Sequence, residues 1–144
     1  MNRLARFVSK TILAIDYGEK RVGLAASDPT GIIASGIGTI GNTPDLVMRI
    51  CALAEERGIT RIVVGLPLTL QGGDSDTTRL VRTFVDTLRQ AVTIPVDLLD
   101  ERFTSVIATQ TIRDMGVGRK KRRDKSKVDE IAAIILLQDY LNRQ

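Results

Sequence analysis

The chain has 144 residues, 43% of them hydrophobic and 26% charged, with a net charge of +4, which is typical of one globular domain of ordinary size. It has no histidine and one cysteine, which excludes histidine-dependent catalysis, histidine-ligated zinc, cysteine zinc clusters and internal disulfides. A hydrolase of this composition must work with carboxylates, lysine, tyrosine and oxygen-ligated metals such as Mg²⁺ or Mn²⁺.

The first predicted element is a β-hairpin that places an acid at the end of its first strand. Residues 12–15 are a short apolar run with the pattern of a strand buried on both faces, and Asp16 ends it. A turn over residues 17–20 leads to a return strand over residues 22–26. A charge at the end of a buried strand is costly unless a positive group lies opposite it. That group is a metal ion, a phosphate-bound metal, or the basic pair that follows the turn.

A third strand and a helix follow the hairpin. Residues 32–40 predict a glycine-weakened strand at an edge of the sheet. Thr43 and Pro44 predict the start of a helix, with Thr43 as the N-cap, and Gly58 predicts its end. This helix has one apolar face, formed by Leu46, Val47, Ile50, Cys51, Leu53 and Ala54.

The rest of the chain alternates strands with helices. Residues 61–65 predict a buried strand, and a helix over residues 74–91 follows after a loop. Residues 95–99 predict a fifth strand, residues 104–115 a weakly periodic helix, and residues 126–141 the last helix. The apolar face of the second helix consists of Leu80, Val81, Phe84, Val85 and Leu88.

Three sequential strands followed by alternating helices and strands predict a mixed α/β sheet whose later strands are parallel. No internal repeat, low-complexity tract or linker divides the chain, so we expect a single domain over residues 1–144. Residues 1–10 are expected to form an N-terminal extension, and residues 116–125 a basic loop.

Two of the predicted strands end in acids that are candidates for a metal site. Asp16 ends the first strand, and Asp100 and Glu101 end the fifth. Strand alternation lets only one member of that pair face a given side of the sheet, and the pattern alone does not decide which. Each acid also has an ordinary explanation, as a turn residue or as a partner of a nearby basic side chain.

A third acid, Asp129, lies near the start of the last helix. An acid in the first turn is favoured by the helix dipole, which explains it without any function. The small residues Ala132 and Ala133 share its face of the helix, however, and favour close contact with the sheet, which would turn Asp129 inward. Three such acids brought together would have the composition of a two-metal site that clamps a phosphoryl group.

Four ordered blocks of the sequence resemble the signature blocks of the YqgF/RuvX family, and together they span most of the chain. The blocks are IDYGEKRVG at 15–23, VGLP at 64–67, DERFT at 100–104 and KSKVD at 125–129. The family consists of bacterial proteins with a ribonuclease H-like fold. They are regarded as candidate Holliday junction resolvases and as nucleases that mature the 5′ end of pre-16S ribosomal RNA.

The resemblance implies a ribonuclease H-like α/β fold, with a five-stranded mixed sheet in the order 3-2-1-4-5 flanked by helices. It also implies that Asp16, Glu101 and Asp129 are the catalytic residues and the ligands of Mg²⁺ or Mn²⁺, with two ions expected. In the related RuvC-type resolvases the second acid ends the fourth strand, where this chain has Gly65. Glu101 must therefore reach across from the next strand.

Positive charge is concentrated in residues 119–127, which hold seven of the 21 basic residues and leave 14 basic against 16 acidic residues elsewhere. Such a segment predicts contact with a polyanion, although runs of like charge are also typical of solvated loops. Lys20 and Arg21 are placed either to touch the scissile phosphate or to neutralise Asp16. The predicted nucleic-acid-binding residues are Lys20, Arg21, Arg119, Lys120, Lys121, Arg122, Arg123, Lys125 and Lys127.

We therefore predict a divalent-metal-dependent endonuclease on structured nucleic acid, with processing of the 5′ end of pre-16S rRNA as the leading activity. The alternatives are a resolvase of branched DNA and a ribosome assembly factor that binds nucleic acid without cleaving it. A junction resolvase would act as a symmetric homodimer. No membrane partner is expected, because no apolar stretch is long enough to span a bilayer. With no recognisable signal peptide and one cysteine, a cytoplasmic location fits.

Overall fold

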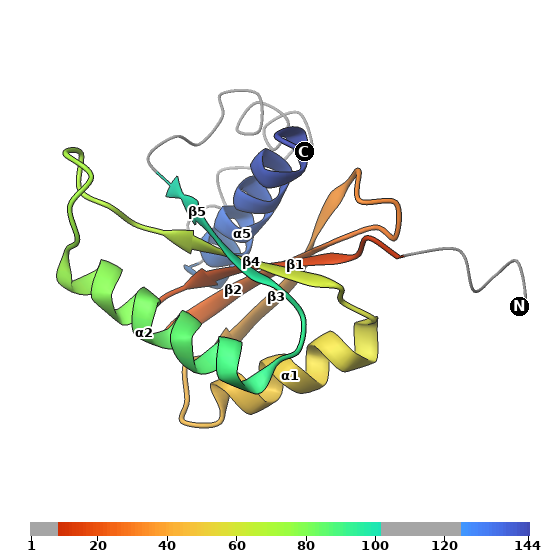
Figure 1. The fold of residues 1–144 in the computed structure, drawn as a ribbon, viewed down its shortest axis with the longest axis horizontal. Coiled ribbons are helices and arrows are strands. Elements are labelled where there is room, and N and C mark those ends of the chain that lie inside the picture. The colour runs from red at the N-terminus through yellow and green to blue at the C-terminus, as the bar shows by residue number, and fades with distance from the viewer. Residues whose placement is uncertain (1–8, 102–124) are drawn as a thin grey trace, which may run out of the picture.

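The computed structural model describes residues 9–101 and 125–144, which form a five-stranded sheet with helices on both faces (Figure 1). The strands are β1 (Ile12–Tyr17), β2 (Arg21–Ser27), β3 (Ala34–Gly41), β4 (Arg61–Leu66) and β5 (Val96–Asp100). The helices are α1 (Leu46–Arg57), α2 (Asp76–Ala91) and α5 (Lys125–Asn142). In Figure 1, α1 and α2 lie on one side of the sheet and α5 lies on the other.

The strand order β3-β2-β1-β4-β5 confirms the order expected from the sequence. Strands β1, β2 and β3 pair antiparallel, with β3 at the edge, and β4 and β5 continue the sheet parallel to β1. The arrowheads of β1, β4 and β5 therefore point to the same side of the molecule (Figure 1). Open α/β sheets generally bind their ligands at the carboxyl ends of parallel strands, so a functional site is expected at this edge.

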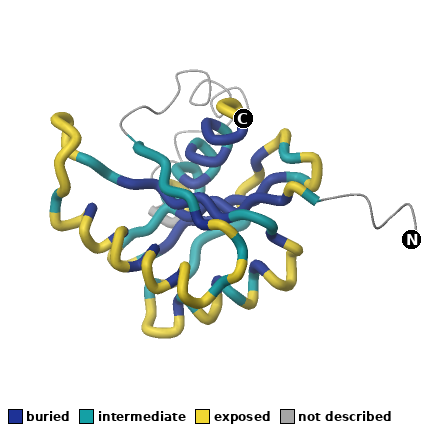
Figure 2. The backbone as a smooth tube through the Cα atoms, viewed as in Figure 1, coloured by how far each residue is buried: buried dark blue, intermediate teal, exposed yellow. Residues whose placement is uncertain are grey.

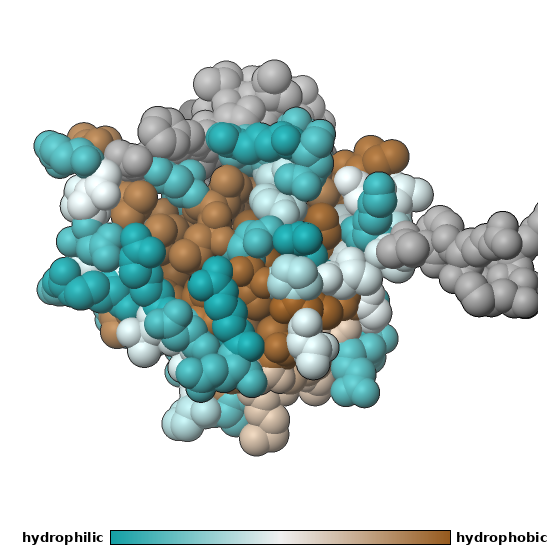
Figure 3. Space-filling view, viewed as in Figure 1, coloured by the Kyte–Doolittle hydropathy of each residue, from teal (hydrophilic) through white to brown (hydrophobic). Residues whose placement is uncertain are grey.

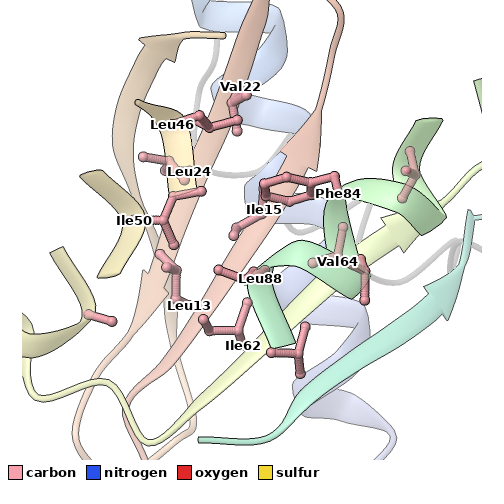
Figure 4. Close-up of a cluster of buried hydrophobic side chains, with 14 of the residues drawn as sticks. Leu13, Ile15, Val22, Leu24, Leu46, Ile50, Ile62, Val64, Phe84 and Leu88 are labelled. Carbon is pink, nitrogen blue, oxygen red and sulfur yellow. The ribbon is translucent and has the colours of Figure 1, made fainter. Parts of the chain in front are cut away.

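The face of the sheet under α1 and α2 is a closed hydrophobic core. Leu13 and Ile15 of β1 point to this side, because strand side chains alternate, and both are fully buried. Figure 4 shows them between the strands and the two helices, together with Ile50 of α1 and Phe84 of α2. The ring of Phe84 stacks on the ring of Tyr17, at a centroid distance of 4.6 Å. This packing fixes the carboxyl ends of the central strands in place.

The opposite face is covered by α5 through smaller side chains. Ala14 of β1, Ala25 of β2 and Ala133 of α5 are fully buried there, so the helix lies close to the strands. The approach is closest at Gly23 in β2, where a Cβ atom would lie 2.0 Å from the carbonyl oxygen of Asp129. Only glycine fits at such a contact. The close helix–sheet packing predicted from the alanines is confirmed, and a glycine of the sheet completes it.

The exposed surface follows the outer sides of the helices. Figure 2 shows buried residues along the strands and exposed residues along the outer sides of α1 and α2. In Figure 3, hydrophilic residues lie along the outer side of α2, while hydrophobic residues gather in the middle of the view. None of the helices in the described part of the chain is long and apolar enough to cross a membrane.

The predicted start of α1 is wrong, whereas its predicted end is confirmed. The helix begins at Leu46 with Asp45 in the N-cap position, not with Thr43 as its cap. The N–H of Leu46 donates to the carbonyl oxygen of Thr43 at 2.9 Å, and the Thr43 hydroxyl bonds the Asp45 carboxylate. These residues thus form a separate turn before the helix. Gly58 ends the helix in the left-handed conformation, with a φ of 64°.

Helix α2 begins at Asp76, later than the predicted residue 74. Ser75 and Thr78 form a capping box, in which the side chain of each accepts the backbone N–H of the other. Asp74 lies before this cap, and its carboxylate accepts two hydrogen bonds from Arg82, at 2.9 and 3.1 Å. One member of the predicted apolar face is misplaced: Leu80 is 43% exposed, whereas the other four are buried.

Several predicted features lie outside the described residues. They are the helix over residues 104–115, residues 1–8 of the N-terminal extension, and residues 116–124 of the basic loop. The division of the chain into an extension, a nuclease domain and a basic loop therefore stays a prediction.

Candidate active site

Strand alternation places Asp16 on the α5 side of the sheet. Its neighbour Ile15 belongs to the core under α1 and α2, so the Asp16 carboxyl points to the opposite side. In the register of β1 and β2, Asp16 pairs with Gly23, the residue directly beneath the backbone of Asp129. Two acids from opposite ends of the chain therefore lie over the same small area of the sheet.

Glu101 reaches the same area from the end of β5. A Cβ atom at Gly65 in β4 would lie 2.2 Å from Glu101 Oε1, so the missing side chain of Gly65 makes room for the carboxyl. Glu101 and Asp16 are hydrogen-bonded through their side chains. Asp100, by contrast, pairs with Leu66 of the α1/α2 core and so lies on the other side of the sheet. Of the two acids between which the sequence leaves a choice, Glu101 is the one beside Asp16.

Asp129 is held by a basic residue of the hairpin. The Nε–H of Arg21 donates to Asp129 Oδ2 at 2.9 Å. The two side chains are 37% and 26% exposed, so the ion pair lies at the rim of the site, not deep within it. The expectation that Arg21 neutralises Asp16 is not what the structure shows, because its ion pair is with Asp129.

Burial disturbs the ionisation of the two inner acids. It raises the pKa of Asp16 to about 6, with the charge of Asp129 adding to the rise and the hydrogen bond from Glu101 opposing it. Burial also raises the pKa of Glu101 to about 7, with the charge and the hydrogen bond of Asp16 as further causes. Two carboxyls joined by a hydrogen bond share a proton. Acids disturbed in this way at strand ends are typical of functional sites.

The donor set fits a hard divalent cation. Carboxylates from β1, α5 and the end of β5 are oxygen ligands of the kind that Mg²⁺ and Mn²⁺ prefer. A cation bound here would favour the ionised carboxylates. It would thereby offset the desolvation and the charge repulsion that raise the pKa values of Asp16 and Glu101. As the described side chains stand, no three acidic or cysteine residues form an arrangement that could hold a metal ion. Arg21 already binds Oδ2 of Asp129, so it would compete with a cation for this carboxylate.

The predicted nucleic-acid-binding residues are described only in part. Lys20 is exposed in the turn before β2. The Nζ of Lys127 lies 3.6 Å from Glu130 Oε1, and Lys125 is the first residue of α5. The other members of the predicted set lie outside the described residues: Arg119, Lys120, Lys121, Arg122 and Arg123. Their contact with nucleic acid stays a prediction.

Two glycines, which are not among the predicted site residues, make room for the acids of the site. Gly23 lets α5 bring Asp129 onto the sheet, and Gly65 makes room for Glu101. Neither glycine carries chemistry, so a search for reactive side chains passes over both. The available signal was a glycine inside a buried strand pattern, which indicates that another part of the molecule approaches closely.

Comparison with known sequences identifies one family. The profile of the RuvX family, described as Holliday junction resolvase, matches residues 10–143. A candidate pre-16S rRNA nuclease of Chloroflexus aurantiacus is 44% identical over 133 residues, covering 91% of this chain and 86% of the relative. Another, from Porphyromonas gingivalis, is 44% identical over 132 residues, covering 91% of this chain and 95% of the relative.

Solved structures share the fold. RuvC of Thermus thermophilus, in complex with a Holliday junction substrate, superposes with a TM-score of 0.62 at 12% identity, covering 92% of this chain and 95% of that one. The fowlpox virus Holliday junction resolvase gives a TM-score of 0.57 at 13% identity, covering 93% and 99%. At such low identity the likeness establishes the fold alone, and it confirms the expected ribonuclease H-like architecture.

Proposed function

This chain belongs to the RuvX family, and from that membership we propose that it is a divalent-metal-dependent endonuclease acting on structured nucleic acid. Nucleases of this family are hydrolases of phosphodiester bonds. We assign the precursor of 16S rRNA as the leading substrate, in line with the names of the relatives. The observation that carries the proposal is the meeting of Asp16, Glu101 and Asp129 over one area of the sheet, at the carboxyl ends of β1 and β5.

In the proposed mechanism, Asp16, Glu101 and Asp129 are the residues that would hold Mg²⁺ or Mn²⁺. Bound divalent cations would supply Lewis acidity for hydrolysis of the phosphodiester. Before serving as ligands, Asp16 and Glu101 give up the proton that they share, which their raised pKa values make available near neutral pH. Arg21 and Lys20, at the open rim, contribute positive charge toward the phosphate group that is cleaved.

A resolvase of branched DNA is the second candidate activity. It is favoured by the description of the matching family and by the fold shared with RuvC. The same acids would serve on either substrate, so the chemistry of the site does not distinguish RNA from DNA. A symmetric junction would call for two copies of the site, and hence for a homodimer.

One cleavage panel tests the proposal and ranks the substrates. It contains a pre-16S rRNA leader, a four-way DNA junction, and linear duplex and single-stranded controls, each incubated with Mg²⁺, Mn²⁺ or a chelator. We expect metal-dependent cleavage of the rRNA leader by the wild type. Asp16→Asn should lose more than about a hundredfold in rate, because a metal ligand stabilises the transition state by several kcal/mol. Asp86→Asn, which changes an exposed acid of α2, is the matched control and should cleave normally.

Each outcome of the panel has a definite meaning. Full activity of Asp16→Asn would remove the proposed mechanism. Preferential cleavage of the four-way junction would assign the resolvase activity instead of rRNA processing. Tight binding to the rRNA leader with no cleavage in any metal would assign an assembly factor. Binding alone, with an affinity that falls steeply as salt rises, would not distinguish a nuclease from such a factor.

A further inference from the structure

Asp129, one of the three proposed metal ligands, has a cationic partner in the structure. Arg21 Nε lies 2.9 Å from Asp129 Oδ2, and this ion pair holds the Asp129 carboxylate in position. Asp16 and Glu101 are hydrogen-bonded to each other, and Asp16 also feels the charge of Asp129. Among residues 9–101 and 125–144, the side chains in their present positions do not form a ready metal site. Arg21 thus holds one oxygen of a carboxylate that a bound cation would also need.

The backbone positions of β2 and α5 bring the side chains of Arg21 and Asp129 within reach of each other. Arg21 is the first residue of β2 and lies two residues before Gly23, so both face the α5 side of the sheet. Gly23 carries the backbone of Asp129 directly above it. An arginine at this position of the strand is consequently within reach of the Asp129 carboxylate whenever α5 is docked.

The guanidinium is also suited to a second partner. The ion pair with Asp129 uses Nε, and within the described part of the chain the guanidinium has no other hydrogen bond or ion pair. The planar group can offer its two Nη atoms to phosphate oxygens, and the side chain is 37% exposed at the rim of the site. Lys20, the residue before Arg21, is exposed.

We propose that Arg21 is a positioning residue that holds the Asp129 carboxylate until nucleic acid phosphate takes over its guanidinium, and so couples substrate binding to metal binding. The inference rests on the proposed function, because it needs both a cation site and a phosphate substrate. Arg21 competes with the cation for Asp129 when substrate is absent. Phosphate that draws Arg21 away frees Asp129, and by thermodynamic linkage a bound cation raises affinity for nucleic acid by the same factor.

The first test measures Mn²⁺ binding without nucleic acid, by titration calorimetry and by the electron paramagnetic resonance signal of free Mn²⁺. Arg21→Gln should bind Mn²⁺ about fivefold more tightly than the wild type, because a half-exposed ion pair no longer competes. Arg21→Lys, which keeps the charge but loses the planar fork, should fall between the two. Lys20→Gln removes the same charge from the adjacent exposed position and should change the affinity less than about twofold.

The outcomes of this titration separate the two proposals. Wild-type and Arg21→Gln proteins that bind Mn²⁺ equally well, or a Lys20→Gln variant that gains as much as Arg21→Gln, would overturn the role of Arg21 and leave the metal site intact. Wild-type and Arg21→Gln proteins that both bind no Mn²⁺ would overturn the metal site, the proposed function and this inference together. Normal thermal unfolding of each variant in chelator establishes that the comparison is made on folded protein.

The second test measures the coupling itself. Fluorescence anisotropy reports the affinity for a phosphorothioate RNA hairpin, which resists cleavage, with and without Mn²⁺ at constant ionic strength. Wild type should bind the hairpin about fivefold more tightly with Mn²⁺, the factor expected if bound phosphate removes the competition by Arg21 completely. Lys20→Gln should bind the hairpin more weakly in both conditions and keep the same gain from Mn²⁺. Arg21→Gln should lose most of that gain. An Arg21→Gln variant that keeps the full Mn²⁺ effect would show that the coupling does not pass through Arg21.

Discussion

The two faces of the sheet are made from the same strands and serve opposite purposes. On the α1/α2 face, alternate residues such as Leu13 and Ile15 are large, fully buried and packed against helices along their whole length. On the α5 face the alternate positions hold small residues such as Ala14 and Gly23, and then Asp16 at the strand end. Because side chains alternate along a strand, neighbouring residues of the same strand belong to the hydrophobic core and to the candidate site.

The contrast between the faces explains how the fold tolerates partly buried acids. The α1/α2 core anchors the strands by hydrophobic burial, the main stabilising term in folding. The α5 face can then hold Asp16 and Glu101 although burial opposes their ionisation. Substitutions on the two faces should consequently have different signatures: loss of stability on one, and loss of activity or even a gain of stability on the other.

The largest effect is expected at Gly23, where one substitution should reduce both stability and activity. In Gly23→Ala the new Cβ would lie 2.0 Å from the carbonyl oxygen of Asp129, so α5 must move. We expect a loss of about 3 kcal/mol in unfolding free energy, as for an overpacked core, together with loss of cleavage. Urea unfolding and a cleavage assay measure both effects. Gly41→Ala is the control, because its Cβ would meet only Thr43 Cγ2 at 3.6 Å. Equal stability of the two variants would contradict the close docking of α5.

Gly65→Ala should separate activity from stability. Its Cβ would lie 2.2 Å from Glu101 Oε1, at the far end of a flexible side chain that can swing away. Displacement of a catalytic group by about 1 Å costs on the order of a hundredfold in rate, so we expect a loss of that size. Unfolding free energy should fall by less than about 1 kcal/mol, since no backbone has to shift. A variant with wild-type cleavage kinetics would show that the position of Glu101 does not matter to the reaction.

Asp16→Asn should stabilise the metal-free protein at neutral and higher pH. The pKa of Asp16 is raised from 3.8 to about 6 in the folded state. Ionisation of Asp16 therefore opposes folding; the penalty is absent below the ordinary pKa and complete above the raised one. In chelator we expect Asp16→Asn to be more stable than wild type by about 2 kcal/mol at pH 8, with the gain vanishing near pH 4. Denaturant unfolding at both pH values measures it, and a gain independent of pH would contradict burial as its cause.

The smallest effect is expected from the cap of α2, which lies on the core side. Ser75→Ala removes the hydroxyl that accepts the Thr78 N–H and should cost about 1 kcal/mol of unfolding free energy. Cleavage measured well below the melting temperature should stay at the wild-type level, because α2 packs on the face away from the acids. A marked fall in cleavage rate without loss of stability would mean that the core side takes part in the reaction.

The sequence predicted the fold well because its strands carry strong local patterns. The apolar run before Asp16, the return strand and the parallel strands were all recognisable from their period, and the observed strand order is the expected one. The errors in the predicted elements lie at the starts of helices, because a few local hydrogen bonds determine which residue is the N-cap. Thr43 resembles an N-cap but belongs to a separate turn, and Ser75, a true cap, was not recognised as one.

The candidate site was predictable in composition but not in arrangement. Three acids in matching sequence blocks pointed to Asp16, Glu101 and Asp129, while the choice between Asp100 and Glu101 needed the register of β4 and β5. That Arg21 pairs with Asp129 needed the position of α5 over β2, which no local pattern contains. Contacts between residues distant in the chain depend on the packed fold, and the sequence of either partner alone does not reveal them.

The central claim is that acids from three distant parts of the chain share one cation site, and Mn²⁺ in crystals tests it most directly. Anomalous scattering at the manganese absorption edge locates the ion independently of any assay of activity. We expect manganese bounded by the carboxylates of Asp16, Glu101 and Asp129, with Arg21 turned away from Asp129. Manganese bound elsewhere, or no bound manganese at saturating concentration with the Arg21–Asp129 ion pair intact, would contradict it.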